Sequence, residues 1–566
     1  MKKRIRQAIR MGALLQSVVL LAGCGANGST SSGSSTSASS NTSSAASSVS
    51  SDTSAADTEV SLPLVDEKTT LTLWTPMDAN AASIVDSLGD TEFFQKLEEK
   101  TNVHIEFQHP AIGDEASAYN LMIAGGELPD MIKNSGPSYV YPDGLDAAVD
   151  DGYYMDLTDL IQKYAPHYMA ALEKAGEEDE NLKRSAYTND GRMVGIYQIM
   201  SEQQGPYAGM YVRKDWLDDL GMDTPVTYDD WETMLTAFKD QEGATAPLTL
   251  SYTGYDGFAN ALNAGYGVSN TFYQENGVVK YGPIESGWKD YVEMMHRWYS
   301  EGLIDPDFMS TNAVLPDNAM VTTGKTGAFC SIYTLIAAYE GANSDPNAEY
   351  VPVPAPKVNA EDTVKLNMYY LLGPCITVSA DSPNAELCVK WLDYLFSEEG
   401  ALLANYGTEG DTFEYQEDGT PVFTSKVTAN EDYTFAQAMA YFTMPPSRVC
   451  LQDWKRELAA VPEKDLVSYD IWAEAGTENC LPDVSAMGIS SDENKEYSKI
   501  MTDVTTIVNE KTSQFITGVI SMDEYDDFIA QLKQMNVDRA VEIVQTVYDR
   551  FQEDNRIIHH SFVVSL

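Results

Sequence analysis

Side chains able to do acid–base chemistry are abundant in this chain, but they form no recognisable catalytic pattern. The 566 residues include 86 Asp and Glu. There is no His-Glu-x-x-His, no Gly-x-Ser-x-Gly and no Walker-type phosphate loop. The six histidines are His104, His109, His167, His296, His559 and His560, and only the last two are adjacent. A pair of carboxylates of the kind that hydrolyses glycosides can be drawn at many places, so the sequence does not exclude one.

One acidic cluster has the composition of a cation site. Glu177, Glu178, Asp179 and Glu180 precede Asn181. A dedicated calcium loop alternates Asp and Asn with other residues, and this alternation is missing. We therefore expect a solvated helix face or loop, with no metal and no cofactor. Calcium is the open alternative.

A cysteine near the N-terminus has the surroundings of a lipidation site. Five cations precede an apolar run at 11–22 that is too short to span a bilayer. Leu21-Ala22-Gly23-Cys24 resembles the lipobox of bacterial lipoproteins. The resemblance implies cleavage after Gly23, acylation of Cys24 (diacylglycerol and palmitate), and a stable two-chain membrane anchor. The alternative is an ordinary secretory signal that ends near a cysteine.

Length and charge limit the function classes. About 540 residues remain after such a leader, which is typical of two large lobes. The formal net charge is −50. Nucleic acid is therefore a poor partner, because its binding rests on Lys and Arg. A strongly anionic ligand is also disfavoured unless a local basic pocket overrides the overall charge.

The remaining cysteines are few for this length. They are Cys330, Cys375, Cys388, Cys450 and Cys480, and no two form a Cys-x-x-Cys pair. We expect most to be small buried hydrophobic residues, and the sequence assigns no disulfide.

The segment after Cys24 cannot form a core. Residues 25–57 are almost entirely Ser, Thr, Ala, Gly and Asn. Such a composition predicts a flexible tether with an end-to-end distance of about 30–35 Å.

Beyond the tether, hydrophobic periodicity predicts alternating strands and helices. Strand patterns at 71–74, 103–107 and 129–132 alternate with helical patterns at 93–97 and 119–124. This order favours a parallel sheet with right-handed crossovers. Asn-Asp-Gly at 189–191, Asn-Gly at 276–277 and Asp-Gly at 418–419 predict hairpin turns.

The C-terminal half has clear helix signals. Capping boxes at Thr227/Asp230 and Ser521/Glu524 each precede a helical apolar pattern. A strand is expected at 376–378, and helices at 387–396, 500–508 and 540–551. Residues from Asp554 onward show no pattern.

Five segments, in order along the chain, resemble extracellular solute-binding lipoproteins of ABC importers, in the carbohydrate-binding branch. They are Ala-Gly-Gly-Glu-Leu-Pro-Asp at 124–130, Val-Arg-Lys-Asp-Trp-Leu at 212–217, Trp-Tyr-Ser-Glu-Gly-Leu-Ile-Asp at 298–305, Gly-Lys-Thr-Gly-Ala at 324–328 and Asn-Tyr-Gly-Thr-Glu-Gly at 405–410. The resemblance implies an α/β, two-lobed, periplasmic-binding-protein-like fold. Each lobe is then a mostly parallel sheet flanked by helices, and the C-terminal region is helical.

The resemblance also divides the chain. The implied segments are a signal peptide at 1–23, the lipidated cysteine and tether at 24–65, lobe one at 66–206 and 366–420, lobe two at 207–365 and 421–553, and a tail at 554–566.

Ligand contacts are expected beyond the carboxyl ends of the strands and in loop-rich sequence. Sugar rings lie well on aromatic faces, and the chain has 33 Tyr and 8 Trp. Trp216, Trp231, Trp288, Trp298 and Trp391 sit in helical patterns and are assigned to the core. The candidate contacts are Trp74, Asn134, Ser135, Tyr207, Tyr252, Tyr255, Tyr333, Glu409, Trp454 and Trp472. For each of them ordinary packing or surface exposure is an equal alternative.

The implied function is that of a monomeric, lipid-anchored receptor on the outer face of the cell membrane. It would capture a sugar, such as an oligosaccharide, between two lobes and deliver it to the permease subunits of an ABC importer without breaking bonds. The alternatives are an anchored glycan hydrolase and a receptor for peptides or another non-sugar solute.

Overall fold

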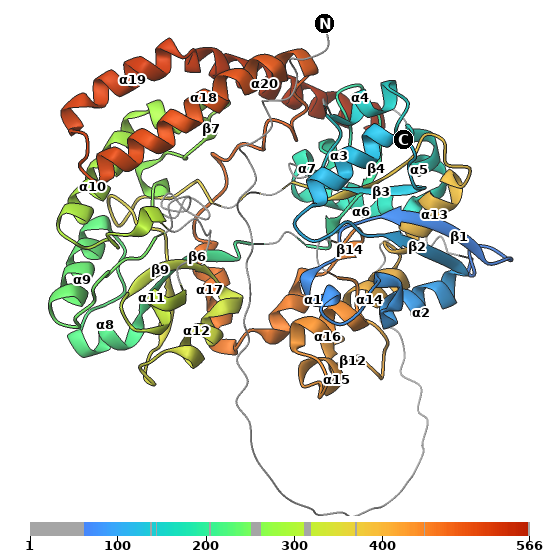
Figure 1. The fold of residues 1–566 in the computed structure, drawn as a ribbon, viewed down its shortest axis with the longest axis horizontal. Helices are drawn as coiled ribbons and strands as arrows, with labels where there is room; N and C mark the ends of the chain where they lie inside the picture. Colours follow the sequence, from blue (N-terminus) through green and yellow to red (C-terminus); the bar gives the residue numbers. More distant parts are fainter. Residues whose placement is uncertain are drawn as a thin grey trace, which may run out of the picture.

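The chain folds into two lobes that lie side by side (Figure 1). The structure is a computed structural model that describes residues 61–135, 139–142, 144–202, 205–250, 262–310, 318–367, 369, 371–445 and 448–563. Each lobe has its own hydrophobic core, one around Phe93, Trp391 and Leu392 and the other around Trp231, Trp288 and Trp298. The two-lobed α/β class is therefore confirmed.

Lobe one is built on a five-stranded sheet in the order β2-β1-β3-β11-β4. Its strands are β1 (Thr69–Trp74), β2 (Val103–Gln108), β3 (Met131–Asn134), β4 (Gly195–Tyr197) and β11 (Cys375–Val378). The first three strands are parallel, as their alternation with helices predicts, while β11 runs antiparallel to both β3 and β4. The carboxyl ends of β1 and β3 therefore meet at one edge of the sheet.

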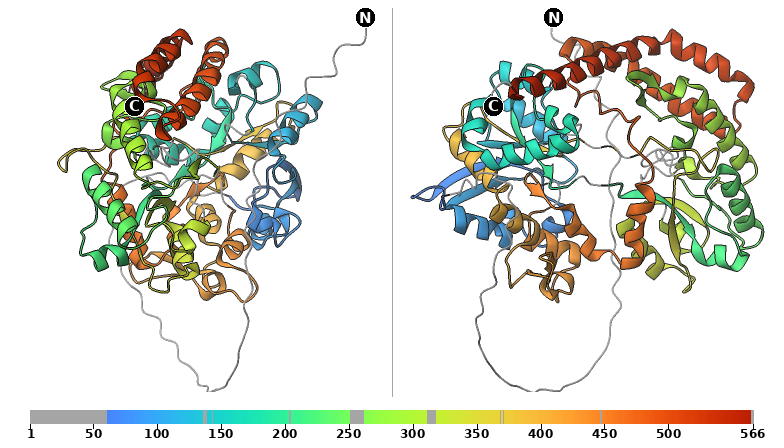
Figure 2. Two further views of the ribbon diagram at one scale, coloured as in Figure 1. Left: turned by 60° about the vertical axis from the view of Figure 1, so that its left-hand side comes forward. Right: turned by 180° about the vertical axis from the view of Figure 1, so that it is seen from behind.

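Helices cover both faces of this sheet (Figures 1 and 2). They are α1 (Ala79–Ala82), α2 (Glu92–Thr101), α3 (Glu115–Gly125), α4 (Gly144–Asp150), α5 (Thr158–Tyr164), α6 (Pro166–Glu178), α7 (Glu180–Arg184), α13 (Ala385–Tyr394) and α14 (Glu398–Tyr406). α3 ends where Gly126 adopts a left-handed conformation, with φ of 72°. The Gly125-Gly126 pair is thus the helix stop that the sequence indicates.

The sheet of lobe two differs from the expected parallel arrangement. Its strands β6 (Ala208–Arg213), β9 (Ala328–Ile332) and β10 (Tyr350–Val353) lie in the order β10-β6-β9, and both pairings are antiparallel. Parallel pairing in the described part of this lobe is reduced to single bridges, which join Leu248 to Ile304 and to Ala328, and Thr227 to Lys357. Pro247, which precedes Leu248, has no N–H to extend a ladder.

Lobe two is otherwise helical, with one hairpin. Its helices are α8 (Lys214–Leu220), α9 (Tyr228–Asp240), α10 (Ser286–Ser300), α11 (Asn318–Thr322), α12 (Ile336–Ala342), α17 (Glu463–Trp472), α18 (Ser491–Ile516), α19 (Tyr525–Gln534) and α20 (Val537–Val563). β7 (Phe272–Glu275) and β8 (Val278–Tyr281) pair through the expected Asn276-Gly277 turn. The capping box at Thr227 precedes α9 as predicted, and the one at Ser521 forms just before α19.

Three segments carry the chain between the lobes. One joins β5 (Ile199–Met200) to β6, a second joins β10 to β11, and the third contains the short 3₁₀ segment η7 (Trp454–Ala460). The position of the third passage differs from the expected lobe boundary between residues 420 and 421. That boundary cuts the hairpin of β12 (Phe413–Tyr415) and β13 (Pro421–Phe423), so residues beyond it remain in lobe one.

The next elements complete lobe one. α15 (Ser425–Thr428) and α16 (Phe435–Phe442) pack beside α1 and α2, and β14 (Leu451–Gln452) pairs in parallel with β5. The third passage therefore follows Gln452. Asn189-Asp190-Gly191 forms a turn after α7, with no preceding strand to make it a hairpin.

The ends of the folded body also differ from expectation. Leu62, Leu64 and Val65 already pack against the core of lobe one, slightly before the predicted boundary at residue 66. At the other end, α20 continues through residue 563, although residues from Asp554 onward show no sequence pattern. α20 starts in lobe two and runs across to lobe one, where it packs beside α7 (Figures 1 and 2).

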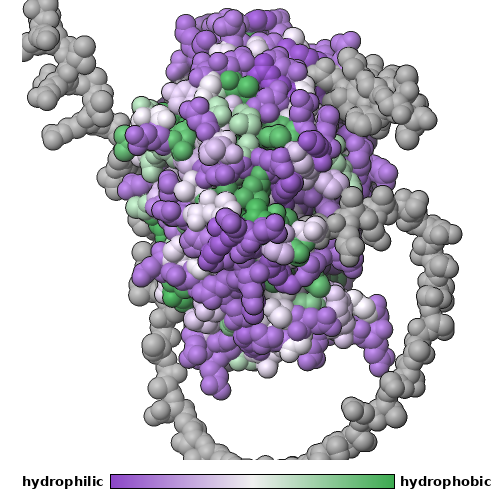
Figure 3. Space-filling model, turned by 90° about the vertical axis from the view of Figure 1, so that its right-hand side faces the viewer, coloured by the Kyte–Doolittle hydropathy of each residue, from purple (hydrophilic) through white to green (hydrophobic). Residues whose placement is uncertain are grey.

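The side of lobe one in Figure 3 is largely hydrophilic, as the net charge of −50 predicts. Within the described residues, no helix is both long enough and apolar enough to cross a membrane.

Candidate functional site

Trp74 ends β1, as predicted, but its side chain is only 5% exposed. Its ring meets Tyr119 and Tyr139 edge-on, at centroid distances of 5.7 and 5.6 Å. The indole therefore belongs to an aromatic cluster of lobe one. This placement fits the alternative in which Trp74 packs against its neighbours and does not contact a ligand.

Asn134 ends β3 and is also buried. Its Oδ1 accepts hydrogen bonds of 3.2 Å from the hydroxyls of Tyr119 and Tyr154. Its Nδ2 donates to the carbonyl of Ile132 and to Thr377 Oγ1. The amide thus joins β3, β11 and two tyrosines. Ser135, the next residue, forms an antiparallel bridge with Tyr139.

Four of the predicted residues come together around α17. Tyr333 and Trp472 belong to one buried cluster, and Tyr207 packs against it. The ring of Trp454 stacks on Tyr469 of α17 at 4.6 Å, with 4° between their planes. Tyr469 also meets Tyr333 edge-on at 6.4 Å. These predicted contacts are therefore distant in the chain but adjacent in space.

Backbone contacts hold these rings where the chain passes between the lobes. The Gly205 N–H donates to the hydroxyl of Tyr469. The Tyr333 N–H donates to the carbonyl of Tyr207 at 3.2 Å. A Cβ on Gly209 would overlap the indole of Trp472, so the small residue permits this packing. The first and third passages are thus joined by aromatic side chains.

The other candidates lie elsewhere. Glu409 is exposed in a turn of lobe one. Tyr252, Tyr255 and Cys24 lie outside the described residues. Glu409, Tyr252, Tyr255 and Cys24 stay predictions.

Charged residues that the sequence analysis did not select adjoin the aromatic group. Arg448 is buried, and its Nη2 lies 2.7 Å from Glu457 Oε1, on η7. Arg456 of η7 is also buried and donates to Thr443 Oγ1 and to the carbonyl of Met444. Lys133 of β3 lies close enough to Arg448 for the two charges to interact. The strand-end rule that selected Asn134 also covers Lys133, whereas no sequence signal marks Arg448.

Burial sets the electrostatics of this charged group. It opposes ionisation of Glu457, yet Arg456 and Arg448 together hold the pKa of this carboxyl below its usual value. Burial lowers the pKa of Arg456 to about 9, and nearby Arg448 contributes. Burial also raises the pKa of Tyr333, with smaller contributions from Tyr469 and Glu457. We call Lys133, Tyr333, Arg448, Trp454, Glu457 and Tyr469 the junction site.

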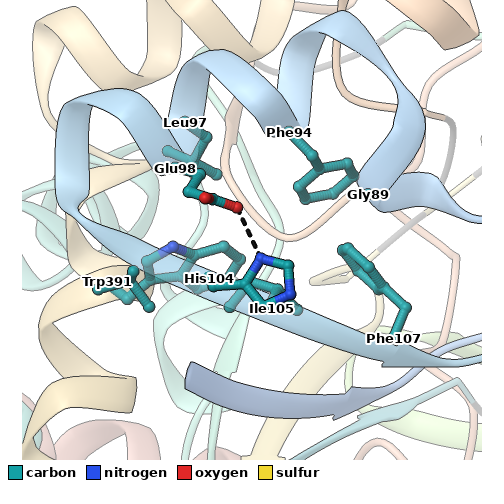
Figure 4. Close-up of a pocket in the computed structure, with 9 residues that line it drawn as sticks. Gly89, Phe94, Leu97, Glu98, His104, Ile105, Phe107 and Trp391 are labelled. Atoms are coloured by element: carbon teal, nitrogen blue, oxygen red, sulfur yellow. Dashed lines mark hydrogen bonds and ion pairs between the residues drawn. The ribbon is translucent and has the colours of Figure 1, made fainter. Parts of the chain in front are cut away.

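A separate recess lies between α2 and β2 (Figure 4). Phe94, Leu97 and Ile105 line it with apolar surface. Its ion pair joins Glu98 and His104 at 2.7 Å, and Glu98 also pairs with Lys68. Because these polar groups already have partners, the recess is a weaker candidate than the junction site.

The described acidic cluster has structural roles. Asp179 caps α7 through Asn181 N–H, and its other oxygen accepts from the Tyr369 hydroxyl at 2.7 Å. No group of three or more His, Cys, Asp or Glu is placed to hold a metal within the described ranges.

The remaining reactive side chains of the described part are also engaged in structure. His109 contacts the carbonyl of Thr75, His167 contacts Asp393, and His296 contacts the carbonyl of Ile516. The five described cysteines are free thiols, and Cys375, Cys388 and Cys450 are buried as expected.

Comparison with known proteins gives consistent results. The model of a family described as bacterial extracellular solute-binding protein matches residues 81–402, more than half of the chain. The fructooligosaccharide ABC transporter substrate-binding protein FusA of Streptococcus pneumoniae is 23% identical, over 87% of this chain and 92% of its own. Lipoprotein LipO of Bacillus subtilis is also 23% identical, over 76% of this chain and 83% of its own.

Solved structures show the same fold. An HMO binding, ABC-transporter associated solute-binding protein from Bifidobacterium longum infantis superimposes with a TM-score of 0.69. It is 18% identical, and the alignment covers 86% of this chain and 99% of that one. Since the family model matches more than half of the sequence, the chain belongs to the bacterial extracellular solute-binding protein family.

Proposed function

We propose that this protein is the receptor of an ABC importer that binds a sugar, such as an oligosaccharide, and presents it to the permease. The observation that carries the proposal is the gathering of Tyr333, Trp454, Tyr469 and Trp472 where the chain passes between two lobes of a solute-binding fold. The name of FusA, a fructooligosaccharide substrate-binding protein, supports a sugar as the solute.

The chemistry of the junction site suits a sugar. Aromatic rings present flat apolar faces to the C–H groups of a pyranose or furanose ring. Glu457 and Arg448 provide charged acceptors and donors beside these rings, which suits directed hydrogen bonds to hydroxyl groups. These residues bind and orient the solute, and no bond is made or broken in this function.

Movement of the lobes provides the transport signal. Periplasmic binding proteins are known to close around a ligand by a hinge motion. The hinge would lie in the three segments between the lobes. Aromatic side chains join the first of these segments to the third. A closed, ligand-bound shape is what a permease would distinguish from the empty receptor.

The protein works outside the cell, tethered by lipid on Cys24. The lipobox Leu21-Ala22-Gly23-Cys24 and the Ser-rich segment after it support this arrangement. The name of the relative LipO, a lipoprotein, supports it as well. A single receptor molecule is sufficient for capture, so the working unit is a monomer.

A thermal-shift screen against neutral and acidic oligosaccharides, short peptides and nucleosides tests the sugar proposal. A true ligand at a hundredfold excess over its Kd stabilises the folded state by about 2.7 kcal/mol, which raises the melting temperature. We expect stabilisation by sugars only. Stabilisation by peptides or nucleosides alone would assign another solute.

Prolonged incubation separates the receptor from the hydrolase alternative. Chromatography of the bound sugar after a day should show the intact compound. Shorter products that appear with the purified protein would establish a glycan hydrolase.

A further inference from the structure

The junction site contains a buried lysine that the neutral-sugar function does not use. Lys133 lies in β3, opposite Ile376 of β11. Side chains alternate along a strand, so Lys133 shares the face of Met131 and points to the core side that holds Cys450. The residue is only 9% exposed. It sits at the carboxyl edge of the sheet, where open α/β sheets bind ligands.

Lys133 has no hydrogen-bond or ion-pair partner among the described residues. Asp78 acts on the charge of Lys133, but Asp78 Oδ1 already accepts from the backbone N–H groups of Asn80 and Ala81. Glu457 is paired with Arg448 instead. A buried ammonium without a counterion is unfavourable, and its cost is normally removed by a partner or by loss of the proton.

The proton is retained at neutral pH. Burial and, to a smaller extent, Arg448 lower the pKa of Lys133 to about 8, and Asp78 opposes this change. At pH 7 the ammonium is therefore still mostly charged. The chain has 86 acidic and only 36 basic residues, so many of its own carboxylates could have served as a partner for Lys133. Its absence leaves the Lys133 ammonium available to a ligand.

We propose that the bound sugar carries a carboxylate, as in a uronic acid, and that Lys133 forms an ion pair with this group. This inference rests on the proposed sugar-receptor function and adds the class of sugar. A carboxylate suits the Lys133 ammonium, which has no partner of its own. Arg448 pairs with Glu457, and Arg456 donates to Thr443 Oγ1 and to the carbonyl of Met444. The Trp454–Tyr469 stack, whose tryptophan belongs to η7, is the platform for the sugar ring.

Isothermal titration with matched sugar pairs tests the inference. The probes are trimers of galacturonate, mannuronate and glucuronate, each compared with its methyl ester, which is neutral and has the same linkages. We expect wild-type protein to bind at least one acid trimer about tenfold or more tightly than its ester. Higher ionic strength should weaken this preference.

Lys133→Met, which keeps most of the buried chain and removes the charge, should lose the preference for the acid. Lys133→Arg should keep part of it. Lys96→Met is the matched control, since Lys96 lies on the surface of lobe one in an exposed pair with Glu99. The ligand-free Lys133→Met protein should melt at the wild-type temperature or above it, because an unpaired buried charge has been removed.

The outcomes separate this inference from the proposed function. Equal binding of acids and esters, or an unchanged preference in Lys133→Met, would overturn the carboxylate assignment and leave the sugar receptor intact. Tight binding of neutral sugars alone would do the same. If no acidic or neutral sugar binds the wild-type protein, the proposed function fails together with the inference.

Discussion

At the scale of single residues, the buried aromatic rings determine what a substitution will do. Trp74 fills space between Tyr119 and Tyr139 and leaves little surface for a ligand in this conformation. The stacked pair of Trp454 and Tyr469 instead joins an inter-lobe segment to lobe two. These two tryptophans therefore have different expected roles.

Trp74→Ala should lower the stability of lobe one by about 3–5 kcal/mol, because truncation of a buried tryptophan leaves a cavity. Thermal unfolding followed by calorimetry measures the change. Trp231→Ala, in the core of lobe two, is the control with a similar expected loss. If Trp74→Ala melts normally and instead weakens sugar binding tenfold or more, Trp74 is a ligand contact.

The strand-end rule located residues well but could not reveal their burial. It identified Trp74 and Asn134 at the ends of β1 and β3, where the structure has them. Whether such a side chain meets a ligand or a neighbour depends on Tyr119, Tyr139 and Tyr154, which come from later segments. Lys133 was missed because a lysine in a strand has no sequence mark of burial.

At the scale of elements, the C-terminal helices are joined by a capping box with an added ion pair. Ser490 caps α18 and exchanges hydrogen bonds with Glu493. Arg550 of α20 donates to both oxygens of Glu493, at 3.1 and 2.8 Å. The Glu493 carboxylate therefore caps the start of α18 and also binds α20.

Glu493 should make stability depend on pH in a narrow acid range. Its hydrogen bonds to Arg550 lower its pKa from 4.5 to about 2. The group therefore stabilises the fold fully above about pH 4.5, and this contribution is lost as pH falls toward 2. Glu493→Gln should cost about 1–2 kcal/mol at pH 7, and the difference from wild type should shrink in that range. Denaturant unfolding at several pH values measures it.

Glu496→Gln is the matched control on the same helix. It removes an exposed ion pair with Arg539 and should change the denaturation midpoint less. A Glu493→Gln difference that stays constant from pH 7 to pH 3 would contradict the assigned coupling.

Local signals predicted elements better than they predicted boundaries. Capping boxes and Gly stops were confirmed because they depend on a few adjacent residues. The expected hairpin at 189–191 was wrong, because a turn sequence does not reveal whether a strand precedes it. The third passage between lobes depends on the pairing of β14 with β5, whose residues are far apart in the chain.

At the scale of the molecule, two separate cores and three connecting segments form a receptor that is acidic overall but has a cationic group at the junction site. The lobes were predictable from the order of elements and from family resemblance. The antiparallel sheet of lobe two was not, because helical and strand periodicity do not specify strand direction.

The proposed anchor predicts where the whole protein is found. Cys24→Ala should remove the acyl site and release the protein into the medium or leave it unprocessed. Fractionation and immunoblotting of cells measure the distribution, and Ser29→Ala in the same N-terminal region is the control. Cys24→Ala protein that still sediments with membranes would contradict the lipoprotein proposal.

The attachment of Leu62, Leu64 and Val65 to lobe one has a mechanical consequence. An N-terminal anchor would keep lobe one within reach of the flexible tether, about 30–35 Å from the membrane, whereas lobe two would be attached only through lobe one. Capture of a solute would then move lobe two relative to the lobe that carries the anchor. Two fluorescent labels, one on each lobe, would accordingly report this movement as a change in the distance between them, whereas the distance of either lobe from the bilayer would vary with the tether.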